Sequence, residues 1–464
     1  MFSSFLEATR RVTVLAYIFT VRLSVFVMPK LFCSFRRFAL AGGIFCAAIT
    51  VAATETNAPP VTPARLTLPA AAALALAQNP SLRAHGFDLR AAEARRQQAG
   101  LRSNPELSLA VEDVLGSGMY RDARNAQTTL QLSQLIELGG KRSARSDIAT
   151  AQRSLKQSDA DLARITVLAT VAEQFVHVLG DQHELALSRD ATKLAEETLA
   201  LAKRRVEAGN ASPIEEKRAR IQLSKARLLE EHDEHELLVA RRKLAALWGA
   251  TNATFAELQA DLFVRPPLPN LDELSARIHR SPELTRWAGE KSVRDAEVKL
   301  ADARRRPDLT AGAGVRQYAG PDDVGFVFQF SLPLPLSDRQ QGTRAEARAL
   351  ADKVEVERAG AELRLRTALF GIAQELIHAD TELAALDRDM LPDAEAALTL
   401  AREGFERARF SQLELLDAQR TLLELRRERI VAAVAYHQFV IEIEKLLGEP
   451  LSPESVQSSK TSQP

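Results

Sequence analysis

Residues 326–332 read Phe-Val-Phe-Gln-Phe-Ser-Leu, so that Phe or Leu occupies every second position. This period of two places the large apolar side chains on one face of a β-strand. Residues 309–316 alternate in the same way. The two runs predict a β-hairpin with one apolar face. Each run also has about the length of a tilted strand that crosses a lipid bilayer.

The same arrangement occurs twice. Alternating runs at 106–112 and 127–133 precede those of the second hairpin by about 200 residues, a spacing far too long for a solenoid. Five collinear matches have offsets between 198 and 202 (329 − 131 and 281 − 79). The pairs are Asn79-Pro80 with Ser281-Pro282, Asn104-Pro105 with Arg306-Pro307, Gln131-Leu132-Ser133 with Gln329-Phe330-Ser331, Ser212-Pro213 with Ser411-Gln412, and Trp248-Gly249 with Leu447-Gly448.

These matches predict a duplicated module, at residues 66–263 and 271–451. A Pro-rich linker at 264–270 joins the two copies, and we expect it to be extended and outside both cores. Residues 452–464 are expected to be a disordered tail. Each module should begin with one helix, at about 69–101 and 271–305, which ends at an X-Pro pair.

A very long helix follows each strand pair. Residues 141–208 contain no proline and predict a helix of roughly 100 Å. Residues 341–408 contain a heptad seam typical of coiled-coil packing, and Pro392 should bend the helix after it. The seam consists of Leu365, Leu369, Ile372, Leu376, Ala379, Leu383, Leu386 and Met390.

Each long helix ends in a short turn before a returning helix. Gly209 fits a helix stop, whereas Ser212, which precedes Pro213, and Ser411 fit helix N-caps. The returning helices carry seams at Ile214, Ile221 and Leu228 and at Leu416, Leu423 and Ile430. The predicted fold is therefore mainly α, with two long antiparallel coiled-coil hairpins, each preceded by a β-hairpin.

The N-terminus has the features of an export signal. Positive residues precede the apolar run 38–49, and the small residues 51–53 follow it. We expect a signal peptide at 28–53, with Met28 as the start and residues 1–27 as an upstream extension. The alternative, a membrane helix at 12–28, is interrupted by Arg22. Acylation of Cys46 is not expected, because a bulky phenylalanine precedes it.

The remaining chain offers few routes to conventional chemistry. Both cysteines, Cys33 and Cys46, fall in the expected leader, so the mature chain would lack a thiol. Lys and Arg number 61, as do Asp and Glu, which argues against nucleic-acid binding. No nucleotide-binding glycine loop or catalytic motif is visible, and we expect neither an enzyme nor a cofactor. His232 and His235 could share a helix face, but a solvated face explains them better than a metal site.

After Thr54 no run of eighteen apolar residues occurs, so we expect no transmembrane helix in the mature chain. Four strands cannot close alone, and an open sheet edge cannot face lipid. Strands that cross a membrane would therefore have to be pooled between subunits. The alternative is two surface hairpins on a periplasmic coiled-coil structural or adaptor protein.

The duplicated order of helix, β-hairpin, very long helix, turn and returning helix resembles the TolC-like outer-membrane factor family across about residues 66–451. The segments 136–142, Ile-Glu-Leu-Gly-Gly-Lys-Arg, and 333–342, Pro-Leu-Pro-Leu-Ser-Asp-Arg-Gln-Gln-Gly, look like the strand-to-helix junctions of its CzcC-type branch, which serves heavy-metal resistance pumps. The resemblance implies a homotrimer in the outer membrane, with a twelve-stranded barrel and a periplasmic α-barrel.

By the same resemblance, the duct would dock on a periplasmic adaptor (a membrane fusion protein) and a proton-driven inner-membrane pump of the RND type. Its cargo would be heavy-metal cations of the Co/Zn/Cd or Cu/Ag class. Export of drugs or type I secretion of proteins is the alternative for such a duct.

Residues 405–418 resemble the tip of TolC-like proteins, where acidic residues ring the tunnel mouth. The match places Glu414 and Asp417 at the acidic positions, and Glu215 of the first module corresponds to Glu414. Phe405 stands where a tyrosine latch is usual and Phe410 where an arginine is usual, which implies an apolar gate. The alternative for Glu414 and Asp417 is a pair of solvated charges after an N-cap. The turns would face the adaptor, through Gly209, Ser212, Pro213, Arg409 and Ser411.

Overall fold

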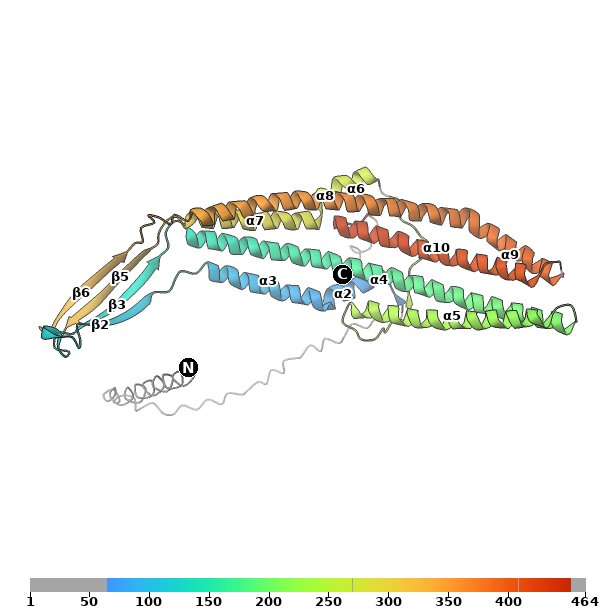
Figure 1. Ribbon diagram of the computed structural model, residues 1–464, viewed down its shortest axis with the longest axis horizontal. Coiled ribbons are helices and arrows are strands. Elements are labelled where there is room, and N and C mark those ends of the chain that lie inside the picture. The colour runs from blue at the N-terminus through green and yellow to red at the C-terminus, as the bar shows by residue number, and fades with distance from the viewer. Residues whose placement is uncertain (1–64, 269, 408, 452–464) are drawn as a thin grey trace, which may run out of the picture. The chain divides into compact units, whose positions relative to one another are not determined.

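The computed structural model describes residues 65–268, 270–407 and 409–451, which all belong to one unit of the chain (Figure 1). The expected leader and C-terminal tail lie outside the described residues. The first module contains α2 (Leu68–Gln78), α3 (Pro80–Ala99), β2 (Glu106–Glu112), β3 (Gln127–Ile136), α4 (Lys141–Glu207) and α5 (Pro213–Ala246). The second contains α6 (Leu271–Arg277), α7 (Pro282–Ala303), β5 (Leu309–Tyr318), β6 (Asp323–Ser331), α8 (Gln341–Ala385), a π-helical turn (Leu386–Met390), α9 (Leu391–Glu406) and α10 (Gln412–Leu447).

The single helix predicted at the start of each module is wrong, because a proline breaks each one. The Asn79 side chain caps α3 by accepting from the N–H groups of Ser81 and Leu82, at 2.9 and 3.2 Å. Ser281 caps α7 in the same way, accepting from the N–H of Leu284. Proline at the first helical position needs no hydrogen-bond partner, so the chain ends one helix and starts the next there.

The four long strands form one antiparallel sheet in the order β2-β3-β5-β6, which confirms the two predicted hairpins and joins them. One face consists of exposed apolar side chains: Leu107, Leu109, Leu130, Leu132, Val315, Phe326, Phe328 and Phe330. The opposite face is polar or small except at Leu135 and Val327. There Gln131 passes over two glycines of β5, and its Nε2 donates to Gln329 on β6 at 2.8 Å. Strands β2 and β6 remain as open edges.

The helices form a layer with α4 at its centre. Nearest the sheet, α4 packs between α3 and α7, and α7 packs on α8. Farther from the sheet, α4 packs between α5 and α10, and α10 packs on α8 and α9. The helices α4 and α10 approach so closely at Gly180 that a Cβ there would lie 2.7 Å from Val434. The two outer edges of the layer are therefore α3 with α5, and α8 with α9.

One of the described helices, α4, is long and apolar enough to cross a membrane by length and composition. Counting unbroken apolar runs did not identify this stretch, because polar residues are interspersed in it. The helix packs against α3, α5, α7 and α10, and residues such as Val171, Phe175 and Val178 belong to the main apolar core. We interpret α4 as the central helix of the layer.

The heptad seam of α8 is confirmed except at its end. Seven of its residues are buried or half-buried, whereas Met390 is 47% exposed. Met390 is the last residue of the π-helical turn that starts at Leu386. The turn rotates Met390 out of the seam, because each residue of a π-turn adds less rotation than one of an α-helix. The predicted seam of α5 does not pack against another helix of the same chain, because Ile214, Ile221 and Leu228 are exposed. As a seam within one chain, this prediction is wrong.

Residues 259–268 carry the chain between the modules. Residues 264–268 lie outside the apolar core, whereas Leu262, just before them, is fully buried in it. The segment is also tied to the second module by polar contacts. The Tyr436 hydroxyl donates to the carbonyl of Pro266 at 2.5 Å, and Arg265 pairs with Asp380 at 2.7 Å. The Arg429 guanidinium stacks on the Phe263 ring, 3.8 Å from its centroid. The linker is thus a strap across α8 and α10.

Candidate functional site at the helical tips

The turn between α4 and α5 is fixed by its backbone. Gly209 has φ of +74°, its N–H donates to the carbonyl of Val206, and the N–H of Asn210 donates to that of Arg205. This Schellman pattern ends a helix and favours glycine at the left-handed position. Ser212 then caps α5 and Pro213 is its first residue, which confirms the predicted stop and start.

The turn between α9 and α10 is tighter. The N–H groups of Arg409 and Phe410 both donate to the Gly404 carbonyl, at 2.8 and 3.1 Å. A Cβ on Gly404 would lie 2.1 Å from the Phe410 ring, so the ring needs glycine beneath it. Ser411 caps α10 as predicted, and it forms a reciprocal capping box with Glu414.

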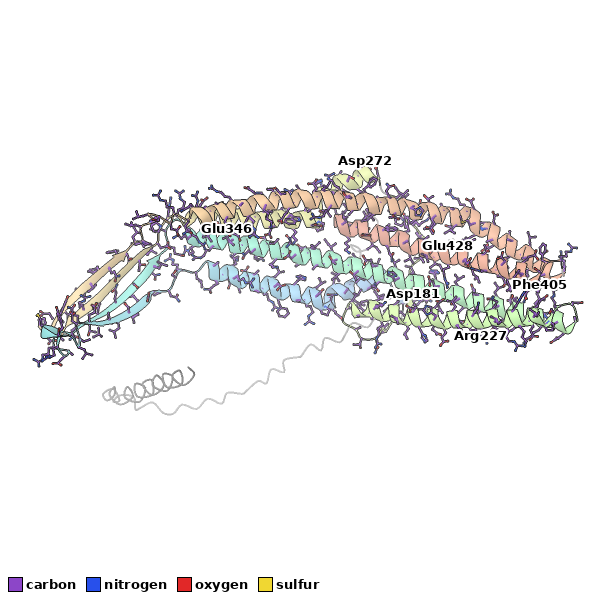
Figure 2. All side chains as sticks on the ribbon, in the orientation of Figure 1. Asp181, Arg227, Asp272, Glu346, Phe405 and Glu428 are labelled. Carbon is purple, nitrogen blue, oxygen red and sulfur yellow. The ribbon has the colours of Figure 1, made fainter. Side chains whose placement is uncertain are left out.

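The two aromatic residues proposed as a gate have different surroundings. Phe405 lies near the end of α9 (Figure 2). It is fully buried and packs with Ala401 and Leu415. The Arg205 guanidinium of α4 lies 4.1 Å from the centre of the Phe405 ring, and it donates to the Phe405 carbonyl at 2.6 Å. Phe410 is 43% exposed. Phe405 therefore joins the tips of the two hairpins within one chain, and Phe410 is the aromatic that solvent reaches.

Two buried glutamines of α10 make further contacts between the hairpins. Gln412 Nε2 donates to the Glu215 carbonyl at 2.7 Å, and Gln419 Nε2 donates to the Thr198 hydroxyl at 2.9 Å. Sequence reasoning missed these residues as well as Arg205. A signal for the glutamines was available, because they are seven residues apart on a coiled-coil helix. A polar residue at such a position typically fixes the pairing of helices.

The predicted acidic residues of α10 lie together. Glu414 and Asp417 are both exposed and line a groove of about 680 Å³ between α4, α5 and α10. The Glu414 carboxylate accepts from the N–H and hydroxyl of Ser411, and these hydrogen bonds lower its pKa. Glu215 is not among the residues that line this groove, and one of its carboxylate oxygens is buried without a hydrogen bond.

A second group of carboxylates lies farther along α4 and α5. Asp181 lies on α4 (Figure 2). Burial, with the nearby charges of Glu184 and Glu236, raises its pKa to about 6. Burial likewise raises the pKa of Glu184. Asp233 is buried, and the nearest cation to its carboxylate is Arg427 at 3.8 Å. The helix interface therefore holds acids that repel one another.

The histidines singled out in the sequence lie on the surface of α5. His232 and His235 are both exposed. In the described ranges 65–268, 270–407 and 409–451, no three His, Cys, Asp or Glu side chains are grouped so that they could hold a metal ion.

The duplicated helical hairpins with one sheet between them define a class of protein, and comparison identifies it. The chain belongs to the outer membrane efflux protein family, whose sequence pattern matches residues 71–250 and again residues 274–449. It is thus a TolC-like protein of the outer membrane that extends into the periplasm, in a family of transport ducts.

Particular relatives place it in one branch. The cobalt-zinc-cadmium resistance protein CzcC of Cupriavidus metallidurans is 33% identical over 405 residues, which are 86% of this chain and 95% of CzcC. The nickel-cobalt-cadmium resistance protein NccC of Alcaligenes xylosoxydans xylosoxydans is 26% identical over 57% of this chain and 60% of its own length. The resemblance to the CzcC-type branch is confirmed.

Solved structures share the fold. CusC superposes with a TM-score of 0.69 at 18% identity, covering 82% of this chain and 92% of CusC. The outer membrane protein VceC of Vibrio cholerae superposes with a TM-score of 0.69 at 18% identity, covering 83% of this chain and 97% of VceC.

Proposed function

We propose that this chain is the outer-membrane exit duct of a tripartite, proton-driven efflux system for heavy-metal cations. The observation that carries the proposal is the similarity to CzcC over nearly the whole of both chains, with a second metal-resistance relative in NccC. Cations of the Co/Zn/Cd class are the favoured cargo, because both relatives are named for cobalt and cadmium resistance.

The duct would be a ring of identical chains. Strands β2 and β6 have open edges, and an edge cannot face lipid unpaired. The edge formed by α3 and α5 lies at the opposite side of the helical layer from the edge formed by α8 and α9. Joining one edge to the other edge of the next copy closes both the sheet and the helical layer. A trimer would give twelve strands, as the resemblance implies.

Exposed apolar residues on both helical edges support this closure. Ile214, Ile221 and Leu228 form a heptad stripe on α5. On the other edge, Val356, Leu363, Phe370 and Ile377 form a second heptad stripe on α8, and Leu400 is exposed on α9. Seven-residue spacing is what a coiled-coil partner requires, so these stripes fit helices of the neighbouring copies.

At the far end of the layer, the tips would form the aperture and the docking surface for the adaptor. In a trimer, Glu414 and Asp417 would give six carboxylates around the opening, which favours cations. The contacts of Phe405 with Arg205 and of Gln419 with Thr198 would hold the two hairpins together in the closed state, with Phe410 at the exposed rim.

Two experiments test the proposal. A strain that lacks this gene should become sensitive to cobalt, zinc and cadmium and regain resistance with the wild-type gene. Sensitivity confined to copper and silver, or to lipophilic drugs, would contradict the favoured cargo. Ring closure is tested separately, since residues after Cys46 contain no cysteine. Ile221 and Leu400 lie at similar distances from the tips, about 12 and 9 Å along their helices. Ile221→Cys with Leu400→Cys should give cross-linked trimers with a short bismaleimide, whereas the same-edge control Ile214→Cys with Leu228→Cys should not.

A further inference from the structure

The four junctions between helix and strand lie at one end of the sheet, because both hairpins are antiparallel (Figure 1). They comprise residues 100–105, 137–140, 304–308 and 332–340. If the apolar face of the sheet contacts lipid, these junctions lie at the membrane surface on the periplasmic side.

Each junction carries or adjoins at least one exposed arginine. Across the described residues, none of these side chains has a hydrogen-bond or ion-pair partner. The set, which we name the arginine belt, is Arg102, Arg142, Arg304, Arg305, Arg306 and Arg339. The other cations of the junctions are paired: Lys141 with Asp308 at 2.8 Å, and Arg344 with Asp302 at 2.5 Å. The paired cations hold the junctions together, and the belt remains as surface charge.

Nearby carboxylates neutralise the belt only in part. Asp302 lies close enough to attract Arg305, but its ion pair is with Arg344, and Asp308 is likewise paired with Lys141. Asp338 is the exposed acid next to Arg339 in sequence. The exposed acids Glu106, Asp147 and Glu346 lie farther along the chain from the belt, and Glu346 is one turn into α8 (Figure 2). Asp338 accepts hydrogen bonds from Gln340. The chain as a whole has no net charge, so this surplus of arginine is local.

Stabilisation of helix ends does not explain the belt. Arg304 follows the C-terminus of α7, where a cation is favourable. Arg142 and Arg339, however, lie at the N-terminal ends of α4 and α8, where the helix dipole disfavours a cation. Neither N-terminus has a side-chain cap, so each adds partial positive charge to the same surface.

Exposed apolar residues accompany the arginines. Leu334 and Leu336, in the junction after β6, are 70% and 77% exposed, and Leu101 is also exposed. They adjoin the apolar face of the sheet. Leucine beside arginine is the composition of a segment that lies in the interface, with the leucines in the acyl region and the guanidinium groups among phosphates.

We infer that the arginine belt binds the headgroup phosphates of anionic phospholipids in the periplasmic leaflet and fixes the depth of the duct in the membrane. This rests on the proposed placement of the sheet in lipid. Guanidinium groups form paired hydrogen bonds with phosphate oxygens, which suits Arg in preference to Lys here.

The test uses purified full-length protein in a neutral detergent, titrated with phosphatidylglycerol or phosphatidylcholine while the thermal midpoint is followed. The variant carries Arg102→Gln, Arg142→Gln, Arg304→Gln and Arg339→Gln, one change for each junction. Its matched control carries Arg95→Gln, Arg218→Gln, Arg358→Gln and Arg388→Gln, which are exposed arginines on the helices.

Phosphatidylglycerol should raise the midpoint of the wild type and the control more than phosphatidylcholine does. In the belt variant its apparent affinity should fall by more than about tenfold, because each cation near an anionic surface contributes roughly fivefold. Equal effects of the two lipids on the wild type, or an unchanged affinity in the belt variant, would overturn the inference, as would stabilisation by inorganic phosphate alone. If the fourfold variant does not fold, Arg102→Gln with Arg339→Gln replaces it.

Channel conductance in a phosphatidylcholine bilayer separates the two proposals. If the wild type conducts but shows no preference for anionic lipid, the proposed duct stands and the proposed lipid binding by the arginine belt is contradicted. A wild type that does not conduct contradicts the duct.

Discussion

Replacing Phe405 by alanine should open the tip. The ring is fully buried in a small cluster with Ala401 and Leu415, and it also carries the Arg205 contact. Truncating a buried phenylalanine costs about 3 kcal/mol at the lower end of the usual range, which suits a small cluster. Losing the cation–π contact adds about 1 kcal/mol. Together these shift the balance between joined and separated tips by roughly a thousandfold.

The assay is single-channel conductance in planar bilayers. Phe405→Ala should show larger or longer openings than the wild type. Phe405→Leu is the matched control, since it keeps an apolar side chain in the cavity and loses only the ring, so an intermediate effect is expected. The helices elsewhere should stay intact, because the Phe405 cluster is separate from the main core. If Phe405→Ala conducts like the wild type while circular dichroism shows a normal fold, Phe405 is not a latch.

The remaining predictions concern pH, selectivity and docking. Asp181→Asn should stabilise the protein by about 1 to 2 kcal/mol above pH 6 and leave its stability unchanged below pH 4. The raised pKa means that ionising Asp181 destabilises the folded state, and the effect is moderate because the side chain is only half-buried. Thermal melts at a series of pH values check this. Glu414→Gln with Asp417→Asn should lower cation selectivity in reversal-potential measurements, whereas Glu424→Gln in the same groove should not. Equal changes of the reversal potential in the two variants would contradict the proposed acidic ring. Gly209→Val should abolish metal resistance with oligomers intact, because the φ of +74° at this position strains a β-branched residue by about 1 to 2 kcal/mol. Gly209→Asn should retain resistance, because asparagine tolerates this backbone conformation. If both variants are sensitive to metals, the added side chain disturbs docking and backbone strain is not the cause.

Residues with a strong local preference were predictable from the sequence. The alternation at 326–332 and the proline-free stretch after Lys141 each required one type of element, and both are present. Ser212 and Ser411 were identifiable as caps because their side chains satisfy backbone groups within three residues. The short helices were misjudged at Asn79 and Ser281, since the proline after each was treated only as a mark of the repeat.

The candidate site was predictable in part. Gly209, Glu414 and Asp417 were placed on the correct turn and helix because they depend on local geometry. The partners of Phe405 could not be found in this way, since Arg205 is 200 residues away and nothing in the sequence near either residue identifies the other.

What the sequence alone determined was the order and type of the elements, the duplication and the apolar face of each strand, because hydrogen bonding and side-chain periodicity act over a few residues. Only the tertiary structure decided which helices lie at the two edges, since the stripes of Ile214 and Val356 have the same heptad spacing as the buried seam at Leu369. The heptad spacing of apolar residues shows that one face of a helix is suited to packing against another helix. Which partner it receives depends on packing between segments that are far apart in the chain.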